Sequence, residues 1–328
     1  MNDNDLPMLA EIARAALPRF ELAADLTISL INLSENATYR VDVEGVPAYA
    51  LRVHRGGYHS RAAIQSELNW LMALREDGVV QTPLPVRGRD GEFIQLVASD
   101  RAEARHVVLS QWEQGREPDV AEDLSKSFAA LGEVTARMHA HAKQWQRPEG
   151  FTRHIWTWET ALGDAAPHWG RWRDGLGMDG AKADLFHHAA QLVKARLAQF
   201  GDSADDFGLS HCDLRLANLL VDGDEVKVLD FDDCGFSWFM YDAATPVSFY
   251  EHLPKVPGLI ENWLEGYARV RAIAQREIDE IPTFLMLRRL LLVAWIGSHR
   301  ETELAQSMGV EYTAQTVDLA RNYLKKCG

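Results

Sequence analysis

The alternation of apolar and polar residues predicts that the beginning of the chain is built mainly from strands. Apolar residues at helical spacing predict one short helix over residues 6–17, which ends before Pro18. Period-two alternation then predicts three antiparallel strands, over residues 26–33, 38–43 and 48–53. A turn at Glu44-Gly45 joins the last two of these strands, so the pattern predicts a small antiparallel sheet.

One helix and a second hairpin follow this sheet. Apolar residues at helical spacing predict a helix over residues 60–76. Alternation resumes after a turn at Asp90-Gly91 and predicts strands over residues 93–98 and 105–109. Five strands and one main helix therefore complete the first part of the chain.

Beyond residue 115 the pattern is mainly helical. Apolar positions three and four apart predict helices over residues 120–141, 181–200, 260–274, 278–299 and 312–326. His139 and His141 are interpreted as polar residues at a helix end rather than as ligands. The segment 151–175 holds four tryptophans, Trp156, Trp158, Trp169 and Trp172. Core or lid packing is the default interpretation of these rings, and an aromatic wall around a cationic substrate is the alternative.

Composition narrows the class of protein. The 328 residues are 47% hydrophobic and 25% charged, as in ordinary globular proteins, and the formal net charge is −14. A negative chain without a basic stripe argues against nucleic-acid binding.

The acidic N-terminus predicts no signal peptide. The densest apolar run, residues 284–296, is broken by Arg288 and Arg289, which predicts no membrane span. Three scattered cysteines favour a reducing compartment, so we expect a cytoplasmic protein.

The strongest candidate for chemistry is a polar stretch in the middle of the helical part. His211 and Asp213 are followed by Asn218 in the pattern H-x-D-x-x-x-x-N. A short hairpin then turns at Asp222-Gly223, and its return strand ends at Asp230. The hairpin therefore brings Asp213, Asn218 and Asp230 to the same end.

Phosphate transfer from ATP requires these residue types. Mg²⁺ ions that bridge nucleotide phosphates prefer hard oxygen ligands, which the carboxylate of Asp230 and the carboxamide of Asn218 supply. The acceptor hydroxyl must be oriented toward the γ-phosphate. A carboxylate at Asp213 can accept the hydrogen bond of that hydroxyl and later its proton.

Two simpler interpretations of the same stretch stay open. Asp and Asn favour turns for backbone reasons, so these residues could be turn formers on a solvated hairpin. His211, Cys212 and Cys234 could bind zinc, although their spacing fits no common structural zinc pattern.

The motif resembles that of the aminoglycoside phosphotransferase and choline kinase family, which has a protein-kinase-like fold. The resemblance rests on H-x-D-x-x-x-x-N followed by a strand and D-x-D, here Asp230-Phe231-Asp232. Homoserine kinase type II and a bacterial stress-response kinase are similar. The resemblance implies an α+β, two-lobed fold. Residues 1–110 would form a nucleotide-binding lobe with an antiparallel sheet, and residues 111–328 would form the hinge and a helical lobe with the catalytic loop and acceptor site.

The resemblance also implies which residues hold the nucleotide. Arg52 ends the third strand where the family has a phosphate-binding lysine, and the two side chains are not interchangeable. Glu67 in the next helix is expected to pair with Arg52. The flap over the phosphates lacks glycine, and the hinge corresponds to residues 110–115. The flap and hinge residues expected to contact the nucleotide are Ser34, Asn36, Gln111 and Trp112.

Other residues around the catalytic loop receive roles in the same way. Asp232 is expected to join Asp230 as a metal ligand, because residues two apart share one side if the strand continues. Arg215 is grouped with Asp213 as catalytic, and would neutralise the transferred phosphate, bind substrate or pair with Asp232 or Asp233. Cys212 is interpreted as a small buried residue where the family commonly has glycine. Asp242 would bind the loop backbone as a support residue.

The predicted function is ATP- and Mg²⁺-dependent transfer of the γ-phosphate to a hydroxyl group of a small molecule, such as an aminoglycoside, choline or homoserine. Two alternatives stay open at this point. A protein Ser/Thr kinase of the stress-response type would have the same motif. A non-catalytic nucleotide-binding pseudokinase is suggested by Arg52 and the flap without glycine. No nucleic-acid or membrane partner is expected, and the sequence makes no prediction of oligomeric state.

Overall fold

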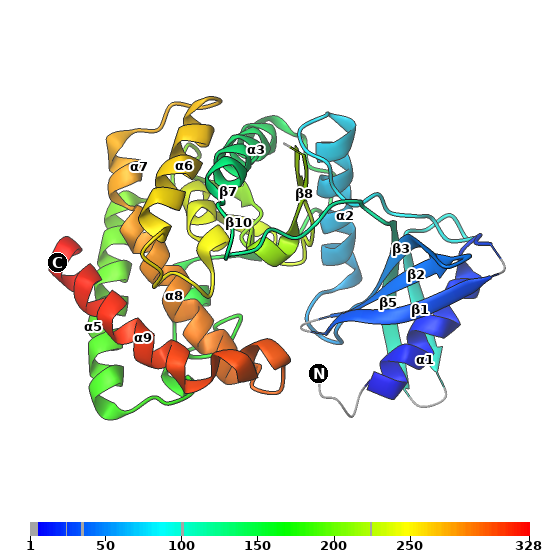
Figure 1. The fold of residues 1–328 in the computed structure, drawn as a ribbon, viewed down its shortest axis with the longest axis horizontal. Coiled ribbons are helices and arrows are strands. Elements are labelled where there is room, and N and C mark those ends of the chain that lie inside the picture. The colour runs from blue at the N-terminus through cyan, green and yellow to red at the C-terminus, as the bar shows by residue number, and fades with distance from the viewer. Residues whose placement is uncertain (1–5, 24, 34–35, 100–101, 224) are drawn as a thin grey trace. The chain divides into compact units, whose positions relative to one another are not determined.

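The computed structural model of the protein describes residues 6–23, 25–33, 36–99, 102–223 and 225–328. The chain forms two compact units (Figure 1). The first unit contains residues 1–77, 82–114 and 147–152, and the second contains residues 78–81, 115–146 and 153–328.

The first unit is built on a five-stranded antiparallel sheet with the strand order β1-β2-β3-β5-β4. Its strands are β1 (Leu26–Leu33), β2 (Ala37–Val43), β3 (Val46–Val53), β4 (Ile94–Ser99) and β5 (Ala102–Gln111). Its helices are α1 (Leu6–Ala16), the 3₁₀ turn η2 (Leu17–Arg19) and α2 (Arg61–Glu76). All five predicted strands and both predicted helices are present. The connection between the predicted strands 93–98 and 105–109 lies partly outside the described residues, at positions 100 and 101.

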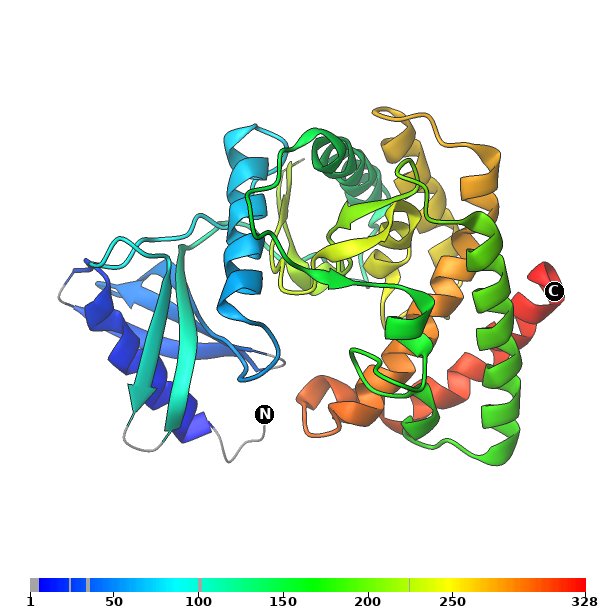
Figure 2. The same cartoon turned by 180° about the vertical axis from the view of Figure 1, so that it is seen from behind.

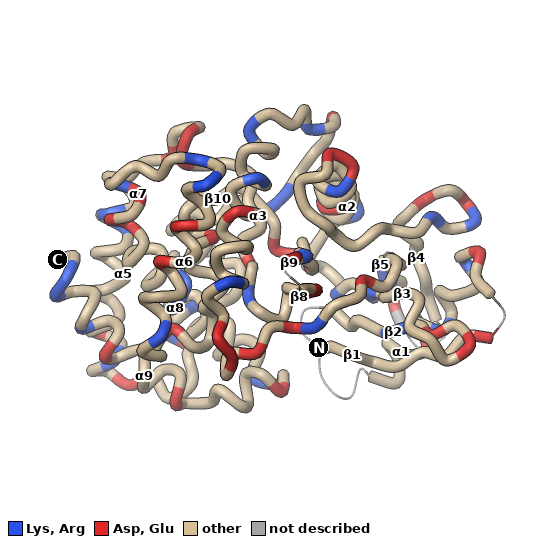
Figure 3. Tube along the Cα trace, turned by 45° about the horizontal axis from the view of Figure 1, so that its top comes forward, with Lys and Arg blue, Asp and Glu red and all other residues tan. Residues whose placement is uncertain are grey.

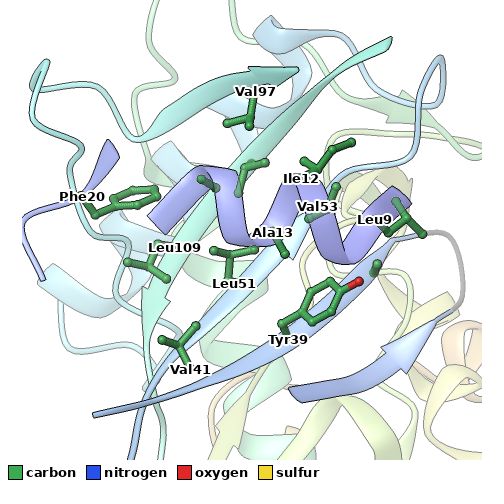
Figure 4. Packing of buried hydrophobic residues seen from close by; sticks show 13 residues of the cluster. Leu9, Ile12, Ala13, Phe20, Tyr39, Val41, Leu51, Val53, Val97 and Leu109 are labelled. Atoms are coloured by element: carbon green, nitrogen blue, oxygen red, sulfur yellow. The ribbon is translucent and has the colours of Figure 1, made fainter. Parts of the chain in front are cut away.

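Helix α1 lies across one face of this sheet and closes the core of the first unit (Figure 4). Leu9, Ile12, Ala13 and Ala16 repeat at intervals of three and four residues, so they form one buried stripe on the helix. The stripe packs against buried side chains of the central strands, including Tyr39, Leu51, Val53 and Leu109.

The second unit is mainly helical. Its helices are α3 (Ser125–Gln144), α4 (Trp158–Leu162), α5 (Gly180–Phe200), α6 (Val256–Ala268), α7 (Gln275–Asp279), α8 (Ile281–Ser298) and α9 (Glu303–Cys327). Its 3₁₀ turns are η3 (Trp172–Asp174), η4 (Leu216–Asn218), η5 (Phe239–Ala243) and η6 (Thr245–Val247). Helices α5 and α9 both pack against α8 (Figure 2).

Five short strands lie within this helical unit. A three-stranded sheet has the order β6-β10-β7 and consists of β6 (His154–Ile155), β7 (Phe207–Ser210) and β10 (Gly235–Trp238). The predicted hairpin is formed by β8 (Leu219–Asp222) and β9 (Glu225–Val228), which are antiparallel. Acidic and basic residues are interspersed along both units (Figure 3).

Four predicted helices have different bounds in the structure, and one of them is α6, which spans Val256–Ala268 rather than residues 260–274. Helix α3 begins at Ser125 rather than at residue 120, because the side chains of Asp119 and Asp123 accept backbone N–H bonds and form turns before the helix. The helix predicted over 278–299 is two helices, α7 and α8, and Pro282 stands in the first turn of α8. Helix α9 begins before the predicted residue 312, and it is kinked at Gly309, where φ is 53°.

Helix α8 also corrects the expectation about apolar runs. Among the described residues, one helical stretch, Gln275–Ser298, is long and apolar enough to cross a membrane. Of its most apolar 18 residues, 83% are buried inside the protein. Arg288 and Arg289 interrupt the apolar run but lie within the helix, as the predicted range 278–299 implies, and each is buried against a carboxylate of another segment. Helix α8 is therefore the central core helix of its unit.

Candidate active site

The catalytic loop after β7 is held by Asp242 of η5. The Asp242 carboxylate accepts hydrogen bonds from the backbone N–H groups of His211 (3.1 Å) and Cys212 (2.8 Å). This is the support role predicted for Asp242. Cys212 adopts a left-handed backbone conformation with φ of 67°, which residues other than glycine rarely adopt. Burial raises the pKa of the Cys212 thiol well above its ordinary value, so it is an inert buried side chain.

A buried histidine supports Asp242 from the other side. His139 Nε2 lies 3.0 Å from an Asp242 carboxylate oxygen, and His139 Nδ1 lies 2.9 Å from the Tyr267 hydroxyl. Burial lowers the pKa of His139 despite the neighbouring carboxylate, so the ring is neutral. Nε2–H therefore donates to Asp242, and Nδ1 accepts from Tyr267. The interpretation of His139 as a polar helix-end residue was wrong.

Asp213 is buried and receives donors on both carboxylate oxygens. Its Oδ2 accepts from Arg215 Nε at 3.2 Å and from Asn218 Nδ2 at 2.7 Å. Its Oδ1 accepts from Arg288 Nη2. Burial raises the pKa of the Asp213 carboxyl, but the charges of Arg288 and Arg215 outweigh burial and hold the pKa below its ordinary value. Asp213 is thus an ionised carboxylate that can accept a further hydrogen bond from a hydroxyl group.

Asn218 is oriented by Asp213. Its side-chain N–H groups donate to the Asp213 backbone carbonyl oxygen (2.8 Å) and to Asp213 Oδ2 (2.7 Å). The carboxamide oxygen of Asn218 therefore points away from Asp213. Leu229 N–H donates to the Asn218 backbone oxygen at 2.8 Å, and His211 Nε2 lies 3.0 Å from the Leu229 oxygen. These bonds tie the end of the β8–β9 hairpin, and with it Asp230, to the catalytic loop.

The chain leaves the strand conformation before Asp230. Strand β9 ends at Val228, and Asp230 has φ of 52°. The predicted alternation that would place Asp230 and Asp232 on one side is therefore absent. The Asp232 backbone N–H instead donates to Asp230 Oδ1 at 3.4 Å. The role of Asp230 and Asp232 as metal ligands stays a prediction.

The tryptophan-rich segment holds the residues that follow Asp230. Trp156 Nε1 donates to the Asp233 oxygen at 3.0 Å, and Arg153 Nε donates to the Cys234 oxygen at 2.7 Å. Trp156, Trp169 and Trp172 are buried, which agrees with the default interpretation of core packing. The guanidinium carbon of Arg288 lies over the Trp169 ring, 5.2 Å from the ring centroid.

In the first unit, Arg52 and Glu67 form the predicted pair. Arg52 Nη1 lies 3.0 Å from Glu67 Oε1, and Glu67 is buried. Ser60 caps α2 by accepting a bond from Ala63 N–H, and this fixes the start of the helix that carries Glu67. The role of this pair in nucleotide binding stays a prediction.

The flap and hinge residues differ in what they contact. Asn36 Oδ1 accepts a bond from Arg55 N–H at 3.0 Å, while Ser34 lies outside the described residues. The segment expected to be an extended hinge begins inside β5. Gln111 is paired with β3, its N–H donates to the Leu84 oxygen, and the Trp112 N–H donates to the Ala48 oxygen. An adenine contact at these two residues therefore cannot use their backbone N–H groups.

One site residue, Arg288, was recognised only in the tertiary structure. It contacts Asp213 from helix α8, while Arg215, which was already grouped with Asp213 from the sequence, also pairs with that carboxylate. A sequence signal for Arg288 did exist, because two arginines stand in the most apolar helix of the chain. Buried charges are costly unless paired, so such residues point to a partner carboxylate.

Residues 27–278 match the model of the phosphotransferase enzyme family. The chain belongs to this family. A solved structure of a microcompartment-associated aminopropanol kinase is 41% identical, with a TM-score of 0.89, and the match covers 97% of this chain and 98% of that chain. Amicoumacin kinase of Bacillus subtilis (strain 168) is 25% identical over 293 residues, which are 86% of this chain and 83% of that protein.

A second solved structure has a similar fold. The structure of the amicoumacin kinase hAmiN in complex with AMP-PNP, Ca²⁺ and Ami has a TM-score of 0.78 at 22% identity, covering 99% of this chain and 96% of that chain. The predicted family and the kinase-like α+β fold of this phosphotransferase are confirmed. Its predicted activity, phosphate transfer to a hydroxyl of a small molecule, is confirmed as well.

Proposed function

We propose that this phosphotransferase uses ATP and Mg²⁺ to phosphorylate the hydroxyl group of a small amino alcohol. The chemistry is supported above all by the ionised, buried carboxylate of Asp213, which lies beside Asn218 at the end of the hairpin. The amino alcohol is supported by the likeness to an aminopropanol kinase over nearly the whole of both chains. A cytoplasmic location is part of the same proposal.

In this proposal residues 1–110 form the nucleotide-binding lobe, and residues 111–328 carry the catalytic loop and the acceptor site. Arg52, fixed by Glu67, binds the nucleotide phosphates. The Asn36 side chain uses its oxygen to hold the backbone of Arg55, so its amide N–H groups are the ones directed to phosphate.

The residues at the end of the hairpin fit a divalent cation. The carboxamide oxygen of Asn218 is directed away from Asp213 because both N–H groups are used there. Asp230 supplies a carboxylate from the adjoining turn. Among the described residues no cluster of three His, Cys, Asp or Glu side chains could hold a metal, which suits a cation that takes further ligands from nucleotide phosphates. When bound, Mg²⁺ would neutralise the negative charge that the phosphate oxygens carry.

The chain's own contribution to the transfer step is orientation. Asp213 accepts a hydrogen bond from the acceptor hydroxyl and aims its oxygen at the γ-phosphorus. A new O–P bond forms as the bond to the β-phosphate oxygen breaks, ADP leaves, and the hydroxyl proton passes to Asp213. General-base assistance of this kind typically contributes about 10²–10⁴-fold.

The test is ATP consumption by the purified protein with a panel of acceptors. The panel contains aminopropanol, choline, homoserine, an aminoglycoside, propanol and a protein substrate. We expect aminopropanol to stimulate ADP formation, propanol to have no effect, and EDTA to abolish the stimulated rate until Mg²⁺ is restored. Stimulation by the protein substrate alone, or by none of the acceptors, would overturn the proposal.

A second prediction concerns the Arg52–Glu67 pair. Glu67→Gln removes the charge that fixes Arg52, so we expect the KM for ATP to rise about tenfold, which is about 1.4 kcal/mol. The KM for the acceptor should not change. Glu76→Gln, an exposed acid at the end of the same helix, is the matched control. An unchanged KM for ATP in Glu67→Gln would contradict the role given to the pair.

A further inference from the structure

Arg288 is held by acceptors from several segments of the second unit. Its side chain is only 1% exposed. Nε donates to Ser248 Oγ at 2.9 Å, and Nη1 donates to the Tyr241 hydroxyl at 3.2 Å and to the Cys212 carbonyl oxygen at 3.3 Å. Nη2 donates to Asp213 Oδ1. Because the guanidinium group is planar and rigid, these contacts together fix its orientation.

The donors around Asp213 leave one position for a substrate. A carboxylate offers about four lone-pair sites, two on each oxygen. Oδ2 accepts from Arg215 and from Asn218, so both of its sites are used. Among the described residues Oδ1 accepts from Arg288 alone. The remaining acceptor site of Asp213 is therefore on Oδ1, next to the bond from Arg288.

We propose that Arg288 is a positioning residue for phosphate transfer, which holds the Asp213 carboxylate so that the remaining site on Oδ1 receives the acceptor hydroxyl. This inference rests on the proposed function of Asp213. The fixed contacts to Ser248, Tyr241 and Cys212 hold the guanidinium group, and the guanidinium group prevents the carboxylate from turning. The acceptor hydroxyl then meets Asp213 in one direction only.

A fixed Asp213 carboxylate couples cleavage of ATP to phosphorylation of the acceptor. If the carboxylate can turn, the acceptor hydroxyl is less well aimed, and a water oxygen can attack the γ-phosphorus in its place. The new O–P bond then forms to water, the bond to the β-phosphate oxygen breaks, and the products are ADP and inorganic phosphate. Loss of Arg288 should therefore increase ATP hydrolysis relative to phosphorylation of the acceptor.

The chain contains a matched control in the next residue. Arg289 lies on the same helix, is also 1% exposed, and pairs with the buried carboxylate of Glu251. Its other donors bind Thr316 Oγ1 and the Tyr312 oxygen, so it does not contact Asp213. Arg289→Lys therefore disturbs a similar buried ion pair without changing the orientation of Asp213.

The experiment compares Arg288→Lys with Arg289→Lys, using aminopropanol as acceptor and measuring both ADP and phosphorylated acceptor. We expect Arg288→Lys to lower kcat for transfer roughly 10- to 100-fold, because a displacement of about 1 Å can cost about 10²-fold. The ratio of phosphorylated acceptor to ADP should fall well below one, while the dissociation constant of ATP stays the same. Arg289→Lys should keep the ratio of the wild type, since a loss of folded protein lowers both products equally.

A wild-type ratio in Arg288→Lys would overturn the inference. If that variant does not fold, Tyr241→Phe and Ser248→Ala each remove one contact of Arg288 and leave its charge in place. Both should lower the ratio, and a wild-type ratio in both would overturn the inference equally. Absence of acceptor-dependent ADP formation in the wild type is a different result, because it would refute the proposed function itself.

Discussion

Asp213→Asn is expected to lose nearly all phosphate transfer while still binding ATP. Asparagine keeps the size of the side chain but cannot take up the proton of the acceptor hydroxyl. General-base assistance is typically worth about 10²–10⁴-fold, so kcat should fall by that order. The dissociation constant of ATP, measured by calorimetry, should change little, because the nucleotide contacts proposed for Arg52 and Asn36 are untouched.

The same substitution also removes the charge that two arginines face. Arg288 is fully buried, so leaving it without a carboxylate should lower the stability of the variant. Activity must therefore be compared per folded molecule. Asp222→Asn is the matched control, because Asp222 is an exposed acid of the hairpin that follows the loop of Asp213, and it lies 3.6 Å from Lys227. Full activity in Asp213→Asn would refute the role given to Asp213.

Gly266→Ala is expected to have the largest effect on stability. A Cβ atom at Gly266 would lie 1.8 Å from the Ala129 carbonyl oxygen of α3, and one at Gly132 would lie 2.0 Å from the Trp263 oxygen of α6. Helices α3 and α6 thus pack backbone against backbone at these two glycines, and the helices must separate to admit a methyl group. Overpacking of a core costs about 1–3 kcal/mol and sometimes more. Urea unfolding would measure this loss.

The control for this prediction lies on the same helix. A Cβ atom at Gly258 of α6 meets nothing within 4 Å, so Gly258→Ala should gain up to about 1 kcal/mol from helix propensity. Equal stability of the two variants would contradict the packing argument. Gly266→Ala should also lose activity, because Tyr267 and His139 meet across the same pair of helices and His139 holds Asp242.

The sequence by itself determined the elements and the motif. Period-two alternation identified the five strands of the first unit, because each strand has one face toward a core and one toward solvent. The pairing of Glu67 with Arg52 was expected from the resemblance to the family, and the structure contains it. The spacing of His211, Asp213 and Asn218 with the Asp222-Gly223 turn was enough to predict the catalytic loop and its hairpin, because all these relations are local.

The tertiary structure alone decided which distant residues complete the site. Arg288 and Asp213 are 75 positions apart, and His139 and Asp242 are 103 apart. No periodicity relates such residues, since their contact depends on how α3 and α8 pack beside the catalytic loop. The positive φ at Cys212 and Asp230 was equally hidden, because neither the identity of these residues nor their position in the motif requires that conformation. The local pattern therefore identified Asp213 as the candidate carboxylate, and long-range packing supplied Arg288 as its partner.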